Sequence, residues 1–238
     1  ELLQYVDQGI LILSAHGTGK KIVNLAKNKG LTVIDAVCND VVSTHDLIGR
    51  ALSKDKQIVY IGKNNHPETE AILQNFPQAN LITQETDVVN LNLDSTKNIL
   101  ITNQTTLSIL EIRNIIQAVL NKYPQAEVNN EICGATRVRQ EAIIKQSNLD
   151  ALIVVGDPNS NNTSMLAQIG FEHGIEHVIR IESIEDLKLE RFKQGWRIGI
   201  TSGASTPTYL TEMVSSYLKS VDLANPQRKP EIDLTKIL

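Results

Sequence analysis

Two cysteines and a His-Pro-Glu triplet are the residues of this sequence best suited to chemistry. Cys38 and Cys133 each follow an apolar run and precede a helical pattern. A helix N-terminus favours the thiolate, the form that ligates metals, although a cysteine buried as a small hydrophobic side chain is the more common case. Pro67 suits the first position of a helix, which places Glu68 in its first turn. Glu68 is then either a carboxylate that stabilises the helix dipole or, with His66 beside it, an acid placed for proton transfer.

Hydroxyl and amide side chains also follow several apolar runs, in the segments 14–17, 103–106, 156–163 and 201–207. Their N–H and O–H groups, together with the positive end of a following helix, suit a phosphate or diphosphate. The alternative for any single residue is an ordinary helix N-cap. Residues 17–20 (Gly-Thr-Gly-Lys) lack the spacing and the final Ser or Thr of a nucleotide-binding P-loop. The spacing of cysteines and histidines also disfavours a zinc site.

Short apolar runs that alternate with helical patterns must position these residues. Such alternation predicts parallel sheets covered by helices, and ligands bind such sheets at the carboxyl ends of the strands. Helices are predicted, for example, over 108–121 and 206–220. The predicted strands span 10–14, 31–37, 57–62, 80–83, 98–102, 127–132, 151–156, 177–181 and 197–201.

The number of strands is too large for one doubly wound sheet and predicts several α/β units. We expect the remainder of a first unit over 1–36, a second unit over 37–132 and a third over 133–205. A C-terminal helix and tail follow over 206–238.

Composition excludes several classes of protein. The 238 residues are 41% hydrophobic with a formal net charge of −4, which argues against disorder and against a strongly basic nucleic-acid-binding protein. No apolar run approaches the ~20 residues that a membrane span needs. Two distant cysteines and no recognisable secretory signal predict a reducing, cytoplasmic location.

Eight short segments in a fixed order carry most of these residues. They are S-A-H-G (14–17), I-D-A-V-C (34–38), T-H-D-L-I (44–48), I-G-K-N-N-H-P-E (61–68), N-Q-T-T-L-S (103–108), E-I-C-G-A-T-R-V-R-Q-E-A (131–142), V-V-G-D-P-N-S-N-N-T (154–163) and T-S-G-A-S-T-P (201–207). Together they resemble the LytB family of 4-hydroxy-3-methylbut-2-enyl diphosphate reductases, which act in non-mevalonate isoprenoid biosynthesis.

The resemblance implies three similar α/β units with mostly parallel sheets around a central cavity, the first of them incomplete here. It implies a [4Fe–4S] cluster held by three cysteines, with the fourth iron open to substrate. The implied reaction removes the allylic hydroxyl with two electrons and protons, giving isopentenyl and dimethylallyl diphosphate. Ferredoxin or flavodoxin would supply the electrons.

The resemblance also assigns roles to individual residues. Cys38 and Cys133 match two of the three cluster ligands, and Glu68 matches the acid that delivers protons. Thr105 matches the hydroxyl that helps to hold this acid, and His66 belongs to the same catalytic group. Residues that match the substrate site are His16, His66, Gln104, Thr106, Ser160, Asn161, Asn162 and Ser205. The Gln104 match also supports the hydrogen bonds of the acid.

The family pattern opens with a Gly-aromatic-Cys-x-Gly-Val segment and a Val-His-Asn motif, neither of which is present in these 238 residues. We therefore expect the first cluster cysteine and one diphosphate histidine to be missing, and cluster binding by this sequence to be weak. An alternative is a truncated or divergent, non-catalytic relative that binds a diphosphate without a stable cluster. A third possibility, independent of the resemblance, is an α/β enzyme that acts on a phosphorylated metabolite.

Overall fold

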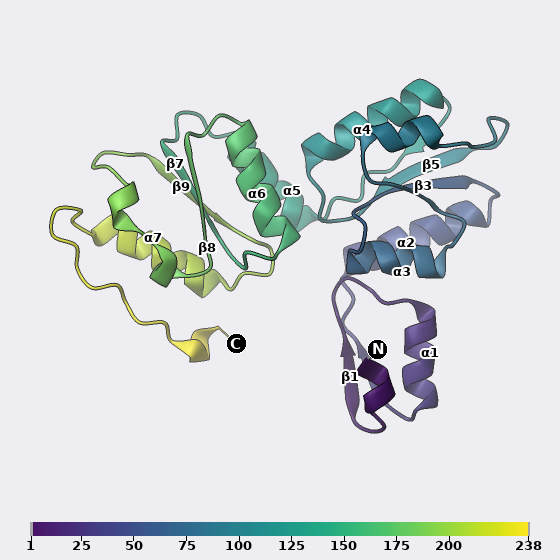
Figure 1. The fold of residues 1–238 in the computed structure, drawn as a ribbon, viewed down its shortest axis with the longest axis horizontal. Helices are drawn as coiled ribbons and strands as arrows, with labels where there is room; N and C mark the ends of the chain where they lie inside the picture. Colours follow the sequence, from purple (N-terminus) through teal and green to yellow (C-terminus); the bar gives the residue numbers. More distant parts are fainter. Residues whose placement is uncertain (1, 238) are drawn as a thin grey trace. The chain divides into compact units, whose positions relative to one another are not determined.

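Nine strands form three separate parallel sheets within residues 2–237, the range that the structure, a computed structural model, describes (Figure 1). Two sheets belong to a first compact unit, Glu1–Cys133, and one to a second, Gly134–Leu238. The predicted α/β class with parallel sheets is confirmed, and three sheets are consistent with three units. The predicted limits of these units stay predictions.

The first unit contains the following elements in chain order: η1 (Leu2–Tyr5), β1 (Ile10–Leu13), α1 (Lys20–Asn28), β2 (Thr32–Asp35), α2 (Asn39–Leu52), β3 (Gln57–Ile61), α3 (Pro67–Asn75), β4 (Asn80–Ile82), η2 (Glu85–Asn90), β5 (Ile99–Asn103), α4 (Ile109–Lys122) and β6 (Glu127–Val128). Here β1 pairs with β2 in a two-stranded sheet, and the other four strands form a sheet in the order β4-β3-β5-β6.

Both faces of the four-stranded sheet are covered by helices. Side chains alternate along a strand, so Val59 and Ile101 face α4 and η2, whereas Ile58 and Leu100 face α2 and α3. Figure 1 shows these helices on the two sides of β3 and β5. Strands buried on both faces explain why the sequence there reads as continuous apolar runs rather than alternating ones.

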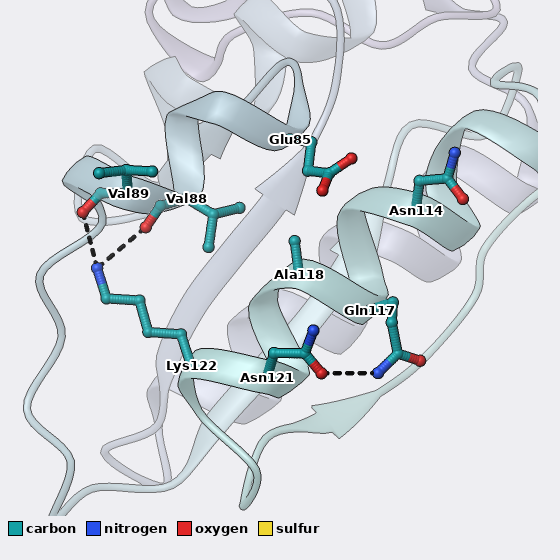
Figure 2. Close-up of a pocket in the computed structure, with 8 residues that line it drawn as sticks. All are labelled: Glu85, Val88, Val89, Asn114, Gln117, Ala118, Asn121 and Lys122. Carbon is teal, nitrogen blue, oxygen red and sulfur yellow. Dashed lines mark hydrogen bonds between the residues drawn. The ribbon is translucent and has the colours of Figure 1, made fainter.

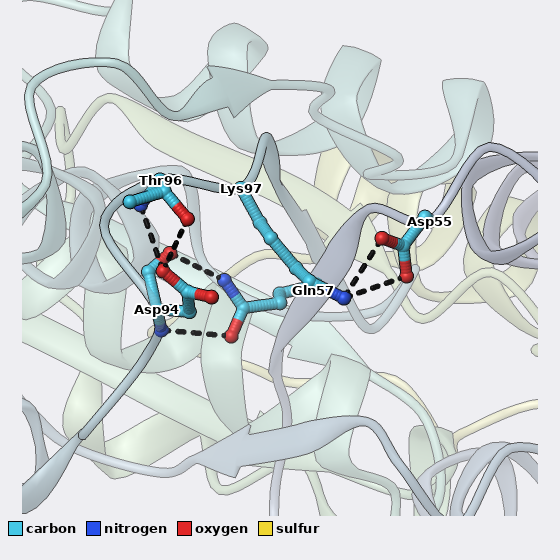
Figure 3. A network of polar contacts seen from close by, with 5 residues as sticks. All are labelled: Asp55, Gln57, Asp94, Thr96 and Lys97. Atoms are coloured by element: carbon cyan, nitrogen blue, oxygen red, sulfur yellow. Dashed lines mark hydrogen bonds and ion pairs between the residues drawn. The ribbon is translucent and has the colours of Figure 1, made fainter.

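A polar network holds the N-terminal ends of β3 and β5 together (Figure 3). Gln57 and Asp94 exchange two hydrogen bonds, of 2.8 and 3.0 Å. Asp94 also caps the turn at Thr96 at 2.6 Å, and Lys97 pairs with Asp55 at 2.8 Å. The predicted site residues Glu68 and Thr105 follow the opposite, carboxyl ends of these strands.

The predicted strand over 127–132 is wrong in its length, because β6 ends at Val128. Asparagine side chains take over the backbone hydrogen bonds beyond this point. The side-chain oxygen of Asn103 accepts the N–H of Glu131 at 3.1 Å, and that of Asn130 accepts the N–H of Ile132 at 3.0 Å. These bonds turn the chain out of the sheet before Cys133.

The second unit contains α5 (Gly134–Ile144), β7 (Ala151–Val155), α6 (Asn161–Glu172), β8 (His177–Ile181), η3 (Ile184–Asp186), η4 (Leu189–Arg191), β9 (Ile198–Ser202), α7 (Thr208–Ser220) and η5 (Leu234–Lys236). Its sheet has the order β8-β7-β9. Leu152 and Val154 pack against α5 and α6, and Ile153 packs on the opposite face with Val214 of α7. None of the helices that the structure describes is long and apolar enough to cross a membrane.

Candidate active site

Glu68 is a fully buried acid at the start of α3. Its Oε1 accepts the Thr105 N–H at 2.8 Å, and its Oε2 accepts the Thr105 hydroxyl at 2.9 Å. The Tyr60 hydroxyl lies 3.4 Å from Oε1 and donates a third, longer hydrogen bond. Burial raises the pKa of Glu68 from 4.5 to about 7, against the opposing effect of the bonds from Thr105 and Tyr60. Near neutral pH this carboxyl group therefore holds a proton for a substantial part of the time.

His66 caps the same helix, because its Nδ1 accepts the Glu68 N–H at 3.2 Å. When the ring is neutral, this bond places its proton on Nε2. Burial, followed by the charges of His16 and Lys63, lowers the pKa of His66 to about 4. The His16 ring meets the His66 ring edge-on, with centroids 5.2 Å apart. His66 is thus a neutral N–H donor at pH 7, next to a second, half-buried histidine.

Gln104 connects the loop after β3 with the loop after β5. Its Oε1 accepts the Lys63 N–H at 3.0 Å and the Thr69 hydroxyl at 3.2 Å, and its Nε2 donates to the Thr106 hydroxyl at 2.9 Å. Gln104 is fully buried. Its side-chain oxygen accepts from two protein donors, an arrangement that agrees with the predicted support of the acid's surroundings, while the predicted contact with a substrate stays a prediction.

Backbone hydrogen bonds connect both cysteines to the segments that carry these residues. The N–H of Cys38 donates to the carbonyl of Ala15, the neighbour of His16, at 3.0 Å. The N–H of Cys133 donates to the carbonyl of Thr105, the residue that holds Glu68, at 2.9 Å. Cys38 is exposed and Cys133 is half-buried. Both predicted ligands therefore belong to segments that contact the acid or its neighbouring histidines.

Two thiols in the segments that follow β2 and β6 fit the donor chemistry of an iron–sulfur cluster, which cysteine thiolates hold. Cys38 is also the N-cap residue of α2, where a thiolate is favoured. Within residues 2–237, however, the structure brings together no group of three His, Cys, Asp or Glu side chains that could hold a metal. The residues present therefore supply two thiols of suitable chemistry and not a set of three.

The remaining predicted donors lie in the second unit, at the carboxyl ends of β7 and β9. Ser160 is the N-cap of α6, and its hydroxyl oxygen accepts the Thr163 N–H at 3.4 Å. Asn162 is only 6% exposed, yet both polar atoms of its amide are buried without a partner among the described residues. Asn161 and Ser205 are exposed. Asn162 is thus the residue of this group whose hydrogen-bonding capacity the described residues satisfy least.

Glycines shape the backbone around these donors. A Cβ at Gly156 or at Gly203 would lie 2.7 Å from the Thr163 hydroxyl oxygen. Gly156 also has a φ of +148°, which side-chain-bearing residues rarely adopt. These close approaches give a physical reason for glycine in the two segments, 156–163 and 201–207, that sequence analysis assigned to anion binding.

A pocket of about 410 Å³ between η2 and α4 is a separate feature (Figure 2). None of the predicted site residues lines it. Its polar groups are largely bonded to the protein. The Lys122 ammonium donates to the carbonyls of Val88 and Val89 at 3.0 and 2.9 Å, and Gln117 donates to Asn121 at 2.9 Å. Lys122 here caps the end of η2, and its ammonium group is engaged by backbone carbonyls.

Sequence analysis did not identify Tyr60, Thr69 or Lys63 as members of the site. Tyr60 carries the one polar side-chain tip in the stretch from Ile58 to Ile61, within a fully buried part of β3. A buried hydroxyl group in an otherwise aliphatic stretch usually has a hydrogen-bond partner, so this residue could have been added to the predicted site.

Comparison with known proteins places these features in a family. The family model described as LytB protein matches residues 2–219. The 4-hydroxy-3-methylbut-2-enyl diphosphate reductase of Anoxybacillus flavithermus is 41% identical over 243 residues, covering 100% of this chain and 77% of the relative. The Shouchella clausii reductase of the same name is 45% identical over 224 residues, covering 93% and 71%.

Solved structures give the same result. The E-1-hydroxy-2-methyl-but-2-enyl-4-diphosphate reductase of Plasmodium falciparum matches with a TM-score of 0.88 at 29% identity, covering 98% of this chain and 77% of that one. A second structure, an (E)-4-hydroxy-3-methyl-but-2-enyl diphosphate reductase described as the terminal enzyme of the non-mevalonate pathway, has a TM-score of 0.61 at 28% identity. With a family model over most of its length and relatives above 40% identity, this chain belongs to the LytB family.

Proposed function

We propose that this chain is a 4-hydroxy-3-methylbut-2-enyl diphosphate reductase, which removes the allylic hydroxyl of that substrate to give isopentenyl and dimethylallyl diphosphate. The relatives that bear this name support the proposal. The observation that carries it is Glu68, a buried carboxyl with a pKa of about 7 whose two oxygens are both held by Thr105. A hydroxyl is a poor leaving group, and a positioned acid that is protonated near neutral pH lets it leave as water.

Proton delivery follows from the orientation of this carboxyl. The Thr105 N–H can only donate, so it holds Oε1 as an acceptor. The Thr105 hydroxyl at Oε2 can donate or accept, so Oε2 is the oxygen that can carry the proton and pass it on. We assign the role of the acid to Glu68. Thr105 orients its carboxyl group, and His66 caps the helix that carries it.

Substrate binding in the first unit is assigned to neutral donors. His66 offers its Nε2–H, and His16 stands beside it. Thr106 belongs to the same loop as Thr105, and Gln104 holds this loop in place. An anion that approached His66 would also favour the protonated ring and so strengthen the contact.

In the second unit, the proposed anion donors are Ser160, Asn161, Asn162 and Ser205. The unpartnered amide of Asn162 is the strongest support for this assignment. The start of α6 adds N–H groups and partial positive charge on the same segment.

Cys38 and Cys133 are the residues that we propose as ligands of a [4Fe–4S] cluster. When bound, such a cluster supplies electrons and an iron that acts as a Lewis acid toward the hydroxyl oxygen. Ferredoxin or flavodoxin is the proposed electron donor, and the cytoplasm the proposed location.

A second candidate is a relative that binds a diphosphate without a stable cluster. The two candidates differ in whether a third cysteine completes the ligand set, since these 238 residues contain two. The gene upstream of the codon for Glu1 separates the two candidates. A further cysteine motif there supports the reductase, and a start codon at this position supports the cluster-free relative.

Anaerobic reconstitution tests the proposal on the protein itself. In these 238 residues alone we expect iron and sulfide to bind weakly. In a protein completed by an upstream cysteine motif we expect full binding with a brown colour, and reduction of the substrate by a chemical electron donor. Cys133→Ser should lose colour and turnover together. A Cys133→Ser protein that retained both would show that this thiol only packs, and tight substrate binding with no bound iron in any preparation would favour the second candidate.

A further inference from the structure

We propose that Tyr60 is a positioning residue for the acid, because its hydroxyl helps to fix Oε1 of Glu68 as the accepting oxygen and so directs the acidic proton to Oε2. Tyr60 lies on β3 and Glu68 in the first turn of α3, two neighbouring elements of the first unit (Figure 1). The inference rests on the proposed function of Glu68 and extends it.

The donors are distributed unequally over the two carboxyl oxygens. Oε1 meets the Thr105 N–H at 2.8 Å and the Tyr60 hydroxyl at 3.4 Å, whereas Oε2 meets only the Thr105 hydroxyl, at 2.9 Å, among the bonds that the structure describes. A protonated carboxyl has one donating and one accepting oxygen. Two donors on Oε1 favour the form in which Oε1 accepts and Oε2 carries the proton. The 3.4 Å bond is long, so Tyr60 acts as the weaker of the two donors.

The fold leaves room for the Tyr60 ring to reach this position. A Cβ at Gly62 would lie 2.8 Å from Cε1 of the Tyr60 ring and 2.6 Å from the Thr69 hydroxyl oxygen. Glycine at position 62 therefore allows the ring and Thr69 to approach the backbone where β3 ends. Tyr60 is fully buried and packs among Ile48 and Ile72 on the face of the sheet that α2 and α3 cover.

The hydroxyl of Tyr60 remains a donor at every pH at which the enzyme would work. Burial, followed by the nearby charge of Glu68, raises the pKa of Tyr60 well above its usual range. The other titratable group next to Glu68 is His66 at the start of α3, with His16 and Lys63 beyond it. Because the pKa of His66 is about 4, its ring stays neutral while Glu68 titrates around 7.

A titration of Glu68 tests this role without any need for turnover. The complete chain is labelled with carbon-13 at the carboxyl carbon of glutamate, and its NMR spectrum is followed with pH. Glu68→Gln identifies the Glu68 signal by deleting it. Tyr60→Phe, which keeps the ring and removes the hydroxyl, should raise the midpoint of this signal by about half a pH unit, the value of one weak hydrogen bond to a carboxylate. Thr105→Val should raise it further, because its hydrogen bond is shorter.

Tyr123→Phe is the matched control. Tyr123 is a second buried tyrosine of the first unit, and its hydroxyl bonds to the Leu91 carbonyl at 2.8 Å and the Leu93 N–H at 2.9 Å. None of the Tyr123 hydrogen bonds that the structure describes reaches Glu68, so removal of its hydroxyl should leave the Glu68 midpoint unchanged. If Tyr123→Phe moved the midpoint as far as Tyr60→Phe does, the effect would be a general loss of packing and the proposal would fail.

Fluorotyrosine provides a test that needs no substitution of Tyr60 by another residue. Incorporated at all five tyrosines, it makes each hydroxyl a stronger donor, and the Glu68 midpoint should then fall instead of rise.

In the reconstituted enzyme, Tyr60→Phe should shift the alkaline fall of kcat/KM to higher pH, whereas a purely structural defect would lower the whole profile. A Glu68 signal that titrates near 7 but does not move in Tyr60→Phe overturns the role of Tyr60 alone. A Glu68 signal with no midpoint near neutral pH overturns the proposed role of Glu68 as the acid.

Discussion

The two sheets of the first unit differ sharply in how well they are covered. In the β1–β2 sheet, Ile12 is 67% exposed and its register partner Ile34 is 46% exposed. In the four-stranded sheet, Ile101 of β5 is fully buried, as is Ile58 of β3. A strand packed on both faces opens only with much of the domain, whereas the two-stranded sheet, one face of which is bare within these 238 residues, is expected to open locally at low cost.

This difference divides the candidate site. Glu68, Thr105 and Cys133 are held by the loops that follow β3, β5 and β6 of the covered sheet. His16 and Cys38 follow the strands of the two-stranded sheet, which has one bare face. The acid is therefore preorganised by the stable region, whereas one thiol and one histidine depend on the weaker region. Ligand or metal binding is expected to stabilise the weaker region more strongly.

The largest expected effect concerns the acid of the covered region. Glu68→Gln keeps the shape of the side chain but cannot release a proton, so turnover of the cluster-loaded enzyme should fall between about 100- and 10,000-fold. Substrate affinity, measured by calorimetry, should change little because Glu68 is assigned to the leaving hydroxyl and not to the diphosphate. Undiminished turnover would remove Glu68 from the mechanism.

Core substitutions compare the two sheets directly. Ile101→Ala removes packing from a closed core and should lower the free energy of unfolding by about 4 kcal/mol. Ile12→Ala is the matched change on the exposed face and should cost less than about 0.5 kcal/mol. Urea unfolding of both variants measures the two values. Equal losses would mean that the face of β1 is covered in solution.

The pH dependence of stability reports the burial of Glu68. Its pKa is raised from 4.5 to about 7 in the folded chain, so the folded state favours the protonated carboxyl. The associated stability is fully present below pH 4.5 and is lost as the pH rises through 7. Glu68→Gln should therefore be more stable than the wild type at pH 8, on the order of 3 kcal/mol, and no more stable at pH 4. Urea unfolding at the two pH values decides this, and a constant difference would place the ionised carboxyl in water.

The smallest effect is expected at the opposite end of the covered sheet. Lys97 and Asp55 form an exposed pair in the network of Figure 3, and such pairs contribute little to stability. Lys97→Ala should leave the urea midpoint unchanged within error. A clear loss of stability would show that the polar network, and not the apolar core alone, holds β3 and β5 in register.

The sequence was informative where continuous apolar runs mark buried strands. All nine strands were predicted within a few residues, except for the last four positions of the strand over 127–132, where the side chains of Asn103 and Asn130 replace ladder bonds. Grouping of Glu68 with Thr105 followed from the family resemblance and from strand ends meeting at one sheet edge. Their roles remain predictions.

The polar pairings that connect one loop to another could not be predicted. That the oxygen of Gln104 is occupied by Lys63 and Thr69, or that Tyr60 reaches Glu68, depends on which strands become neighbours and how closely their ends approach. A single sequence records that a side chain is polar but not which distant group will satisfy it.

The most direct test of the central claim is the pH dependence of kcat/KM, measured anaerobically on the cluster-loaded enzyme. If Glu68 delivers the proton, kcat/KM should fall as the pH rises through about 7, and Glu68→Gln should abolish this fall along with most of the activity. A rate that rises through the same range, or an unchanged alkaline fall in Glu68→Gln, would contradict the account.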